Sequence, residues 1–164
     1  MLKRALPLAV LFTALDQATK LLVQRTFELH ESRAIIPGFL DLHHVINEGA
    51  SWGIFAGWRW SLAVFAIIAL VLLVVFRKHI FPVNQPLPAT TLALLLGGIA
   101  GNLIDRVRLG GVIDFIHVHW RHQYNFPVFN IADTCITLGL ALYIIGQFIA
   151  ERNAKRAAQQ EDAP

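Results

Sequence analysis

Residues 128–150, "VFNIADTCITLGLALYIIGQFIA", decide the fold class, because this apolar run is long enough to cross a membrane. A helix needs roughly 17 to 25 residues to span the hydrocarbon core of a bilayer. The run contains one charged side chain, Asp133, near one end and three residues after Asn130. A charged group at membrane depth is energetically costly and by default marks a functional site. Asp133 is therefore the first candidate functional residue.

Three further runs of the chain have the same apolar character. Only 15% of the 164 residues are charged and 55% are hydrophobic, whereas soluble domains are about 25% charged. The predicted fold is an all-α polytopic membrane protein with a single domain, residues 1–164. The four predicted transmembrane helices are residues 5–24, 60–76, 87–104 and 128–150. The polar tail, 151–164, is predicted to be a fraying helix end or a disordered stub.

The distribution of lysine and arginine predicts the orientation in the membrane. Segments 1–4, 77–86 and 151–164 hold seven basic residues in 28 positions, whereas 25–59 and 105–127 hold six in 58. Cytoplasmic loops are enriched in these residues, so both termini are predicted to be cytoplasmic. All four tryptophans lie in the proposed outer segments or at their edge, as expected of an interfacial belt. This topology accounts for the basic balance, and no nucleic-acid partner is predicted.

Polar residues recur at helical spacing in the first and third predicted helices. Asp16 and Lys20 are four residues apart, and Asn102, Asp105 and Arg106 share one face if the third helix continues that far. Charges inside a membrane usually pair with one another, whatever their role. A structural ion pair and the support of a nearby active site therefore both remain open for Asp16 and Lys20.

Glycines mark both a packing face and a turn in the third predicted helix. Gly97, Gly98 and Gly101 form a small-residue face that lets another helix approach closely. Gly110 and Gly111 then allow a tight turn. The turn is followed by "VIDFI", in which an aspartate returns to an apolar setting.

Asp114 in "VIDFI" and Asp133 in "NIAD" are predicted to meet at the outer end of the bundle. A short connection makes the third and fourth helices antiparallel neighbours, which brings the two carboxylates together. Two carboxylates that share a partly desolvated site hold one proton between them at neutral pH. The ionised group can then take a proton from water while the protonated group donates to a scissile carbonyl. This pattern points to aspartyl peptide hydrolysis, with an N-cap or a salt bridge to Arg106 or Arg108 as the structural alternative for Asp114.

Two other chemistries remain open on the residues alone. Intramembrane aspartates also serve proton-coupled transporters, although no inverted repeat is evident. A metal site built with an aspartate is the second alternative. The histidines that could contribute to it are His43, His44, His117, His119 and His122. Cys135 lies within a predicted membrane helix and is interpreted as a small packing residue.

Five motifs occur in order along the chain: "DQATK", "NEGASWGIF", "GNLIDR", "GGVIDFI" and "FNIAD". With these motifs the chain resembles the bacterial lipoprotein signal peptidases, the signal peptidase II family, from Asp16 to about Gly139. The resemblance implies a four-helix aspartic endopeptidase that needs no metal or organic cofactor. It also implies a small extracytoplasmic sheet after the first helix, within about residues 35–55.

The resemblance carries roles over to particular positions. It implies that Asp114 and Asp133 are the catalytic pair. Residues implied to line the site and orient the substrate are Asn47, Asn102, Arg106 and Asn130. Residues implied to support the site are Asp16, Lys20 and Asp105.

Some positions depart from the family pattern. In the second motif, commonly Asn-x-Gly-Ala-Ala-Phe, Glu48, Ser51 and Trp52 occupy the variable, fifth and sixth places. These changes bear on the wall of the pocket and its lipid contacts. Thr134 stands where serine is usual, which is a mild change.

The implied substrate is a prolipoprotein whose lipobox cysteine already carries diacylglycerol. Cleavage on the amino side of that cysteine releases the signal peptide. The implied setting is the bacterial inner membrane, with membrane lipid as a partner and the site near the outer leaflet. The enzyme is expected to be monomeric.

Overall fold

The computed structural model describes residues 1–49, 59–81, 87–121 and 123–161, and each of the four predicted apolar runs is helical in it. The helices are α1 (Leu2–Thr26), α2 (Arg59–Val75), α3 (Arg77–Ile80), α4 (Pro88–Leu109) and α5 (Ile131–Glu161). α5 continues well past the predicted span, so the start of the polar tail is an extension of this helix. The Trp-rich segment 51–58 lies outside the described residues.

An antiparallel sheet adds a β layer that the all-α label leaves out. Its strands, in spatial order, are β1 (Ser32–Ile36), β2 (Leu40–Asn47), β3 (Val112–Trp120) and β4 (Tyr124–Asn125). The sheet after the first helix is thus present, but half of its strands come from the segment between α4 and α5. The first four residues of β3 are all buried, so the alternation that identifies a half-exposed strand is missing from its sequence.

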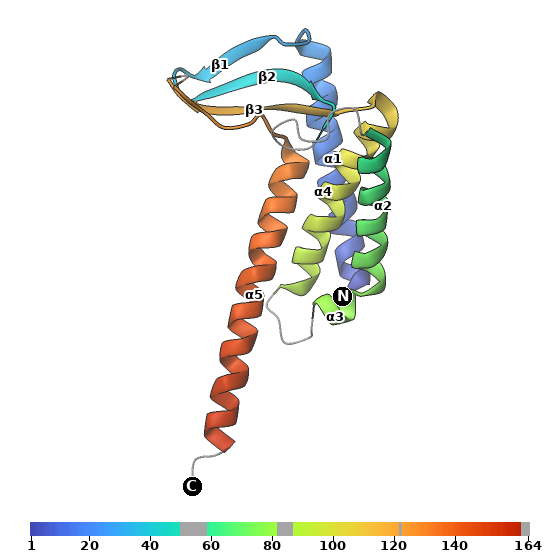
Figure 1. Cartoon of the computed structure of the whole chain (residues 1–164), viewed down its shortest axis with the longest axis vertical. Coiled ribbons are helices and arrows are strands. Elements are labelled where there is room, and N and C mark those ends of the chain that lie inside the picture. Colours follow the sequence, from blue (N-terminus) through green and yellow to red (C-terminus); the bar gives the residue numbers. More distant parts are fainter. Residues whose placement is uncertain (50–58, 82–86, 122, 162–164) are drawn as a thin grey trace.

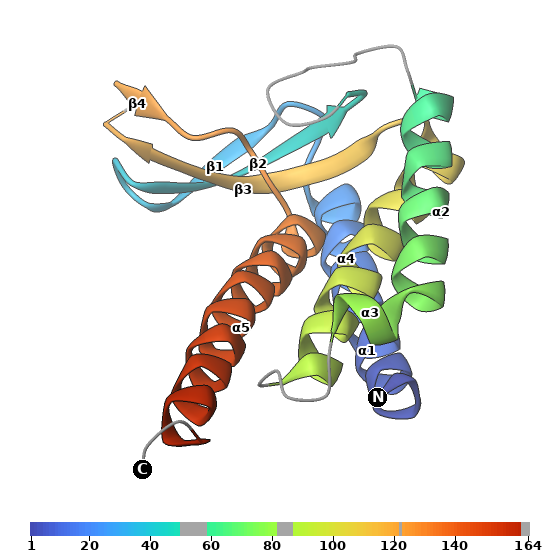
Figure 2. The same ribbon diagram turned by 60° about the horizontal axis from the view of Figure 1, so that its bottom comes forward.

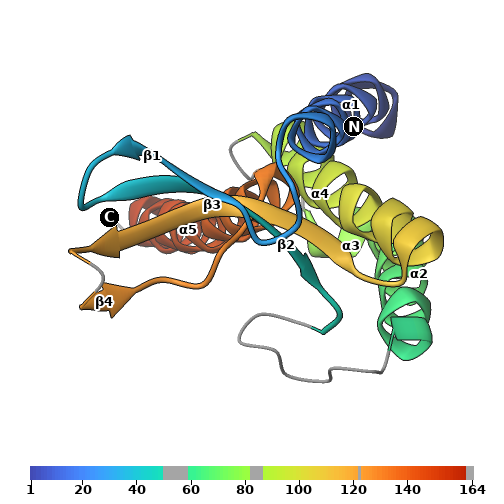
Figure 3. The same cartoon turned by 90° about the horizontal axis from the view of Figure 1, so that it is seen from above.

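The sheet lies at one end of the helices, as Figure 1 shows. α4 rises toward the sheet and α5 descends from it, so these two helices are antiparallel neighbours as predicted. α1 begins and α5 ends at the end of the molecule away from the sheet (Figures 1 and 2). Seen from above, β1, β2 and β3 extend over the end of α5 (Figure 3).

Small residues let α4 approach both α1 and α5 closely, as predicted. A Cβ atom added to Gly97 would lie 2.9 Å from the carbonyl oxygen of Ala9, on α1. One added to Gly98 would lie 2.5 Å from the carbonyl oxygen of Ala132, on α5. Such distances are below van der Waals contact, so only glycine permits this spacing.

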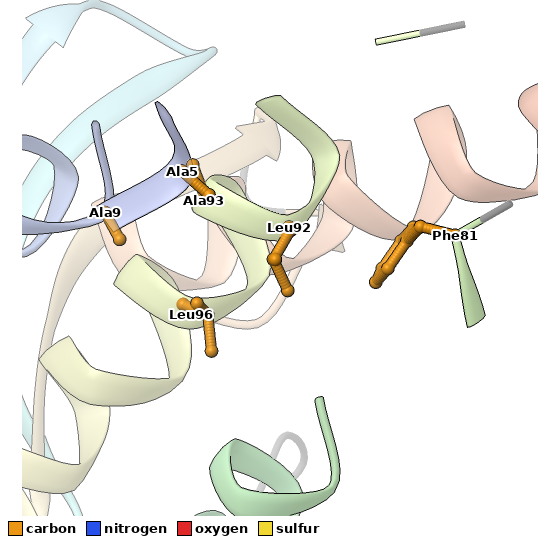
Figure 4. Packing of buried hydrophobic residues seen from close by; sticks show 6 residues of the cluster. All are labelled: Ala5, Ala9, Phe81, Leu92, Ala93 and Leu96. Carbon is orange, nitrogen blue, oxygen red and sulfur yellow. The ribbon is translucent and has the colours of Figure 1, made fainter. Parts of the chain in front are cut away.

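A small apolar core joins α1, α4 and Phe81, the residue that follows α3, at the end away from the sheet. Figure 4 shows its buried residues, which are Ala5, Ala9, Phe81, Leu92, Ala93 and Leu96. Phe81 also packs edge-on against Tyr143 of α5, with 5.5 Å between ring centroids. Three alanines keep the helix axes close, and the larger side chains fill the remaining space.

The outer faces of the helices are apolar rather than polar. α1 and the Ile131–Arg156 part of α5 are long and apolar enough to cross a membrane, and Trp60–Val75 of α2 is a shorter apolar helix. Large side chains such as Val10, Phe65 and Phe148 are between 64 and 69% exposed. α4 instead places ten of its residues in the interior. Contiguous exposed apolar surface of this kind is typical of a lipid-facing or interaction surface.

Candidate active site

Asp114 lies near the start of β3 and is almost completely buried. Gly110 caps the end of α4, and its φ of 81° places it in the left-handed region that favours glycine. The chain turns there into β3, and Asp114 follows as the third residue of the strand. Its Oδ1 accepts a 2.7 Å hydrogen bond from Asn130 Nδ2, and its Oδ2 accepts one of 3.0 Å from Asn47 Nδ2. Asparagine donors, rather than a salt bridge to an arginine, hold this carboxylate.

Asp133 lies in the first turn of α5, where it forms a reciprocal cap with Asn130. The backbone N–H of Asp133 donates to Asn130 Oδ1 at 2.9 Å, and the backbone N–H of Asn130 donates to Asp133 Oδ2 at 3.2 Å. This is the capping-box arrangement, with asparagine and aspartate in the two roles. Asp133 Oδ1 accepts a third hydrogen bond, of 2.7 Å, from Asn102 Nδ2. The carboxylate is thus fixed from both α4 and α5.

Asn130 joins the two aspartates directly. Its side chain donates to Asp114 while its backbone donates to Asp133, and none of its side chain is exposed. Its Nδ2 also lies within hydrogen-bond distance of Asn102 Oδ1, at 3.1 Å. Asn130, which directly precedes α5, therefore connects Asp114 with Asp133.

Both carboxylates line one cavity of about 730 Å³. Its polar end also includes Asn47, Asn102 and Arg106, which the sequence analysis placed in the site. Its apolar wall comes mainly from α2, α5 and the segment before α5. That wall includes Phe65, Ala66, Ala69, Phe126, Pro127, Val128, Phe129, Ile136 and Leu138. The cavity can hold an apolar chain with a polar group at the aspartates.

The environment of Asp114 favours its protonated form. Burial raises the pKa of Asp114 from 3.8 to about 7, and the neighbouring charge of Asp133 acts in the same direction. The hydrogen bonds from Asn47 and Asn130 oppose this rise. A carboxyl group that titrates near neutrality can donate a proton in one step and accept one in another.

Lys20 anchors a second polar layer directly behind the aspartates. Its Nζ lies 2.9 Å from Asp16 Oδ2, 2.8 Å from Asp105 Oδ2 and 2.9 Å from Asn102 Oδ1. The side chains of Lys20, Asp16 and Asp105 are each at most 1% exposed. An ammonium group has three donors, and all three find an acceptor here.

The carboxylates of this second layer hold the backbone beside each aspartate of the pair. Asp16 Oδ1 accepts from the N–H of Ala132, at 2.9 Å, and Ala132 precedes Asp133. Asp105 Oδ2 accepts from the N–H of Ile113, at 3.2 Å, and Ile113 precedes Asp114. Asp16 and Asp105 thus position the pair without contacting it.

Arg106 lies at the rim of the polar end. Its guanidinium donates to the carbonyl oxygens of Asn102 and Gly49 over 3.5 and 3.4 Å. Arg106 also lines the cavity, so its guanidinium is within reach of a bound carbonyl or headgroup.

Gln17 also belongs to this second polar layer, although it was not among the predicted site residues. Its Nε2 donates to Asp105 Oδ1 at 2.9 Å and lies 3.1 Å from the carbonyl oxygen of Gly101. The sequence feature that could have identified Gln17 is a polar amide within an apolar helix, directly after Asp16. Among the positions that depart from the family pattern, Thr134 donates to the carbonyl oxygen of Asn130 at 3.0 Å and lines the cavity. Positions 51 and 52 lie outside the described residues.

Cys135 and the histidines considered for a metal site do not line the cavity, as far as the structure describes them. Cys135 is buried and is not among the residues that line the cavity, which agrees with a packing role. His117 and His119 converge with Asp41 rather than with either aspartate of the pair. His122 lies outside the described residues.

The comparisons with known proteins agree on one family. A family model described as signal peptidase (SPase) II matches residues 8–149. A lipoprotein signal peptidase of Ectopseudomonas mendocina is 42% identical over 156 residues, which cover 93% of this chain and 92% of the relative. One of Syntrophotalea carbinolica is 42% identical over 144 residues, covering 86% and 88%.

Solved structures described as bacterial membrane enzymes have the same fold. One superposes with a TM-score of 0.82 at 35% identity and covers 93% of this chain and 92% of its own. A second has a TM-score of 0.73 at 34% identity and covers 88% and 92%.

Proposed function

The chain belongs to the signal peptidase II family, and from this premise we propose that it is an aspartic endopeptidase that removes signal peptides from prolipoproteins. Asp114 and Asp133 form the catalytic pair. The observation that carries the proposal is that both carboxylates line one cavity and are joined through Asn130. The family match, over most of the chain, supplies the substrate class.

The pair acts by sharing one proton. The ionised carboxylate takes a proton from a water molecule as its oxygen attacks the scissile carbonyl carbon. The protonated carboxyl group donates to the carbonyl oxygen, which gives a neutral tetrahedral diol. Collapse of the diol breaks the C–N bond. The protonated carboxyl group donates its proton to the leaving amine, and the ionised carboxylate takes the proton of one diol hydroxyl, whose oxygen becomes the new carbonyl oxygen. Asn47, Asn102 and Asn130 keep both carboxylates oriented throughout.

The substrate we propose is a prolipoprotein with a diacylglyceryl-modified cysteine, cleaved on the amino side of that cysteine. The apolar wall formed by α2 and α5 suits an acyl chain or the apolar part of a signal peptide. Arg106 and Asn47 at the polar end suit the backbone carbonyls around the scissile bond. No metal or organic cofactor takes part.

The proposed setting is the bacterial inner membrane. α1, α2, α4 and α5 span it as one domain, both termini face the cytoplasm and the sheet lies on the outer side. Exposed apolar side chains on α1, α2 and α5 support this topology, and so does the position of the start of α1 and the end of α5 away from the sheet. The cavity then opens beside the outer leaflet, where a lipid-anchored substrate is confined. We propose that the enzyme acts as a monomer.

A cleavage assay tests the catalytic pair. Purified protein in detergent is mixed with diacylglyceryl-modified prolipoprotein, and release of the signal peptide is followed by gel shift. We expect Asp114→Asn and Asp133→Asn each to lower the rate by at least 1,000-fold, with or without EDTA. Glu151→Gln is the control, because it neutralises an exposed carboxylate on α5 that does not line the cavity.

The same assay separates the alternatives. Normal cleavage by either Asp114→Asn or Asp133→Asn would rule out the pair. A wild-type protein that leaves the substrate intact but conducts protons in liposomes would favour a transporter. Cleavage that EDTA abolishes would favour a metalloenzyme.

A further inference from the structure

β2 and β3 carry a second cluster of chemically active side chains, which the proposed peptidase chemistry does not use. Asp41, His117 and His119 each offer one ligand atom, and these atoms all lie within 4.8 Å of one another. A carboxylate and two imidazoles are ligands that Zn²⁺ and similar ions prefer in proteins.

The register of the two strands brings these ligands together. Asp41 of β2 and His117 of β3 are directly opposite in the antiparallel ladder, so their Cβ atoms are about 4.5 to 5.5 Å apart. His119 follows His117 by two residues and therefore points to the same face of the sheet. The backbone register alone therefore places these three residues next to one another.

A bulge in β2 separates this cluster from the aspartate pair. Asp41 pairs with His117, but Val45 pairs with Asp114, so β2 contains one extra residue between the two pairs. The extra residue reverses the alternation of β2. Asp114 and His117 are three residues apart on β3, and none of Asp41, His117 and His119 lines the cavity that contains Asp114 and Asp133. The cluster thus lies outside the cavity of the aspartate pair.

Burial and spacing suit a metal ion. Asp41 is 7% exposed and His119 is 3% exposed, and buried charged groups are normally paired or bound to a metal. His119 Nε2 lies 3.2 Å from Asp41 Oδ2. Two ligands about 2.1 Å from a tetrahedral Zn²⁺ lie roughly 3.4 Å apart. These two atoms therefore already have the spacing of adjacent ligands.

His117 supplies the third ligand. Its ring centroid is 5.0 Å from that of His119, and 5.9 Å from that of His43, which lies on β2 as Asp41 does. His117 is only half-buried, so its ring can turn toward an ion. An open fourth position next to a partly exposed ligand is accessible to water.

We propose that Asp41, His117 and His119 form a binding site for Zn²⁺ or a similar divalent transition-metal ion, with water completing a tetrahedral coordination. The ion ties β2 to β3 outside the cavity of the aspartate pair. Its role is structural, since neither carboxylate of the pair is among its ligands. The proposal does not depend on the peptidase function.

Metal binding to the full-length protein tests the site. The protein is purified in detergent with its affinity tag removed, treated with EDTA, dialysed and titrated calorimetrically with ZnCl₂. We expect one ion per chain and a rise in Tm on addition of Zn²⁺. His117→Gln and Asp41→Asn should each weaken binding at least tenfold. His79→Gln, an exposed histidine on α3, is the matched control and should bind as wild type does.

Co²⁺ provides a readout that does not require a variant to fold. Tetrahedral Co²⁺ absorbs strongly in the visible region, so the wild-type protein should develop this absorption at one equivalent and lose it when Zn²⁺ is added. Absence of binding to the wild type would overturn the proposal. So would equal affinity in wild type, His117→Gln and Asp41→Asn, which would indicate adventitious binding only. Signal-peptide cleavage measured in parallel should resist EDTA, which keeps this test separate from that of the aspartate pair.

Discussion

At the scale of single residues, Asn130 organises the site. Its backbone and side chain together contact Asp133, Asp114 and Asn102. An amide can donate and accept at once, so this one side chain both caps α5 and orients the carboxylate on β3. A side chain that could only donate or only accept would lose its hydrogen bond either with the backbone of Asp133 or with the carboxylate of Asp114.

The titration of Asp114 predicts the pH dependence of cleavage. The pKa of Asp114 is raised from 3.8 to about 7, so the pair loses its shared proton as the pH rises through neutrality. We expect kcat/KM to fall about tenfold per pH unit above that range, because the doubly ionised pair cannot protonate the scissile carbonyl. On the acid side, kcat/KM should fall when the pair takes up its second proton and loses its base.

Measurement of kcat/KM between pH 4 and 9 gives this profile. A rate that keeps rising to pH 9 would contradict a shared proton.

The same titration affects the stability of the fold. The folded state holds the Asp114 proton more tightly than the unfolded chain does, so the free energy of unfolding should decrease as pH rises from about 4 to 7.

Two lysine pairs with the same spacing predict very different mutational effects. Lys20 and Asp16 are buried, whereas Lys155 and Glu151 are exposed on α5. Lys20→Met should destabilise the protein by roughly 3 to 5 kcal/mol, because buried carboxylates are left without a counter-charge. Lys155→Met is the control and should leave the Tm unchanged.

Thermal unfolding in detergent measures both variants. Adding Asp16→Asn and Asp105→Asn to Lys20→Met should restore part of the lost stability, since the buried charges are then removed together. No recovery in the triple variant would show that Lys20 contributes mainly through packing.

At the scale of elements, the first turn of α5 is where the site is assembled. Ala132 donates its N–H to Asp16 of α1, and Asp133 accepts from Asn102 of α4. The unpaired N–H groups at a helix start need acceptors, and here α1 supplies one of them. The helix start is thereby fixed to two other helices.

The close approach of α4 to α5 predicts a position-specific effect of added methyl groups. In Gly98→Ala, the new Cβ would meet the carbonyl oxygen of Ala132 at 2.5 Å, so the start of α5 must move. We expect cleavage to fall at least 100-fold, because small displacements of reacting groups are costly.

Gly139→Ala is the matched control. An added Cβ at Gly139 would meet the flexible side chain of Leu95 at 2.9 Å rather than backbone. Gly139 lies about two turns after Ala132 on α5. Gly139→Ala should lower the Tm modestly and keep most of the activity. Equal activity in the two variants would show that the position of the α5 start is not critical.

At the scale of the whole molecule, the distribution of side chains is the reverse of that in a soluble domain: the exterior is apolar and charged residues lie in the interior. Large apolar side chains cover the outside of α1, α2 and α5, while Asp16, Lys20 and Asp105 lie inside. Lipid favours this distribution, since polar groups at membrane depth need partners within the protein. The sheet shields one end of this interior (Figure 1).

The proposed topology predicts which positions react with a membrane-impermeant maleimide. In a Cys135→Ala background, Ala34→Cys on β1 should be labelled in spheroplasts. Gln159→Cys at the end of α5 should be labelled only after permeabilisation. Both side chains are exposed, so access rather than burial decides the result. Labelling of both from outside would contradict the proposed orientation.

Much of the architecture was determined by the sequence alone. The apolar runs specify four helices because their composition and length act locally, and the start of α5 follows from Asn130 and Asp133, three residues apart. The i, i+4 spacing of Asp16 and Lys20 likewise determines their contact. The glycine face of α4 is readable for the same reason.

Other features were decided only by the tertiary structure. β3 is buried on both faces at its start, so its sequence carries no strand pattern, and its pairing with β2 joins segments about 70 residues apart. The hydrogen bond from Ala132 to Asp16 and the convergence of Asp41 with His119 also link distant segments. Contacts of this kind depend on register and helix packing, which no local pattern encodes. The sequence determined which residues are chemically able to act, and only the fold determined which of them meet.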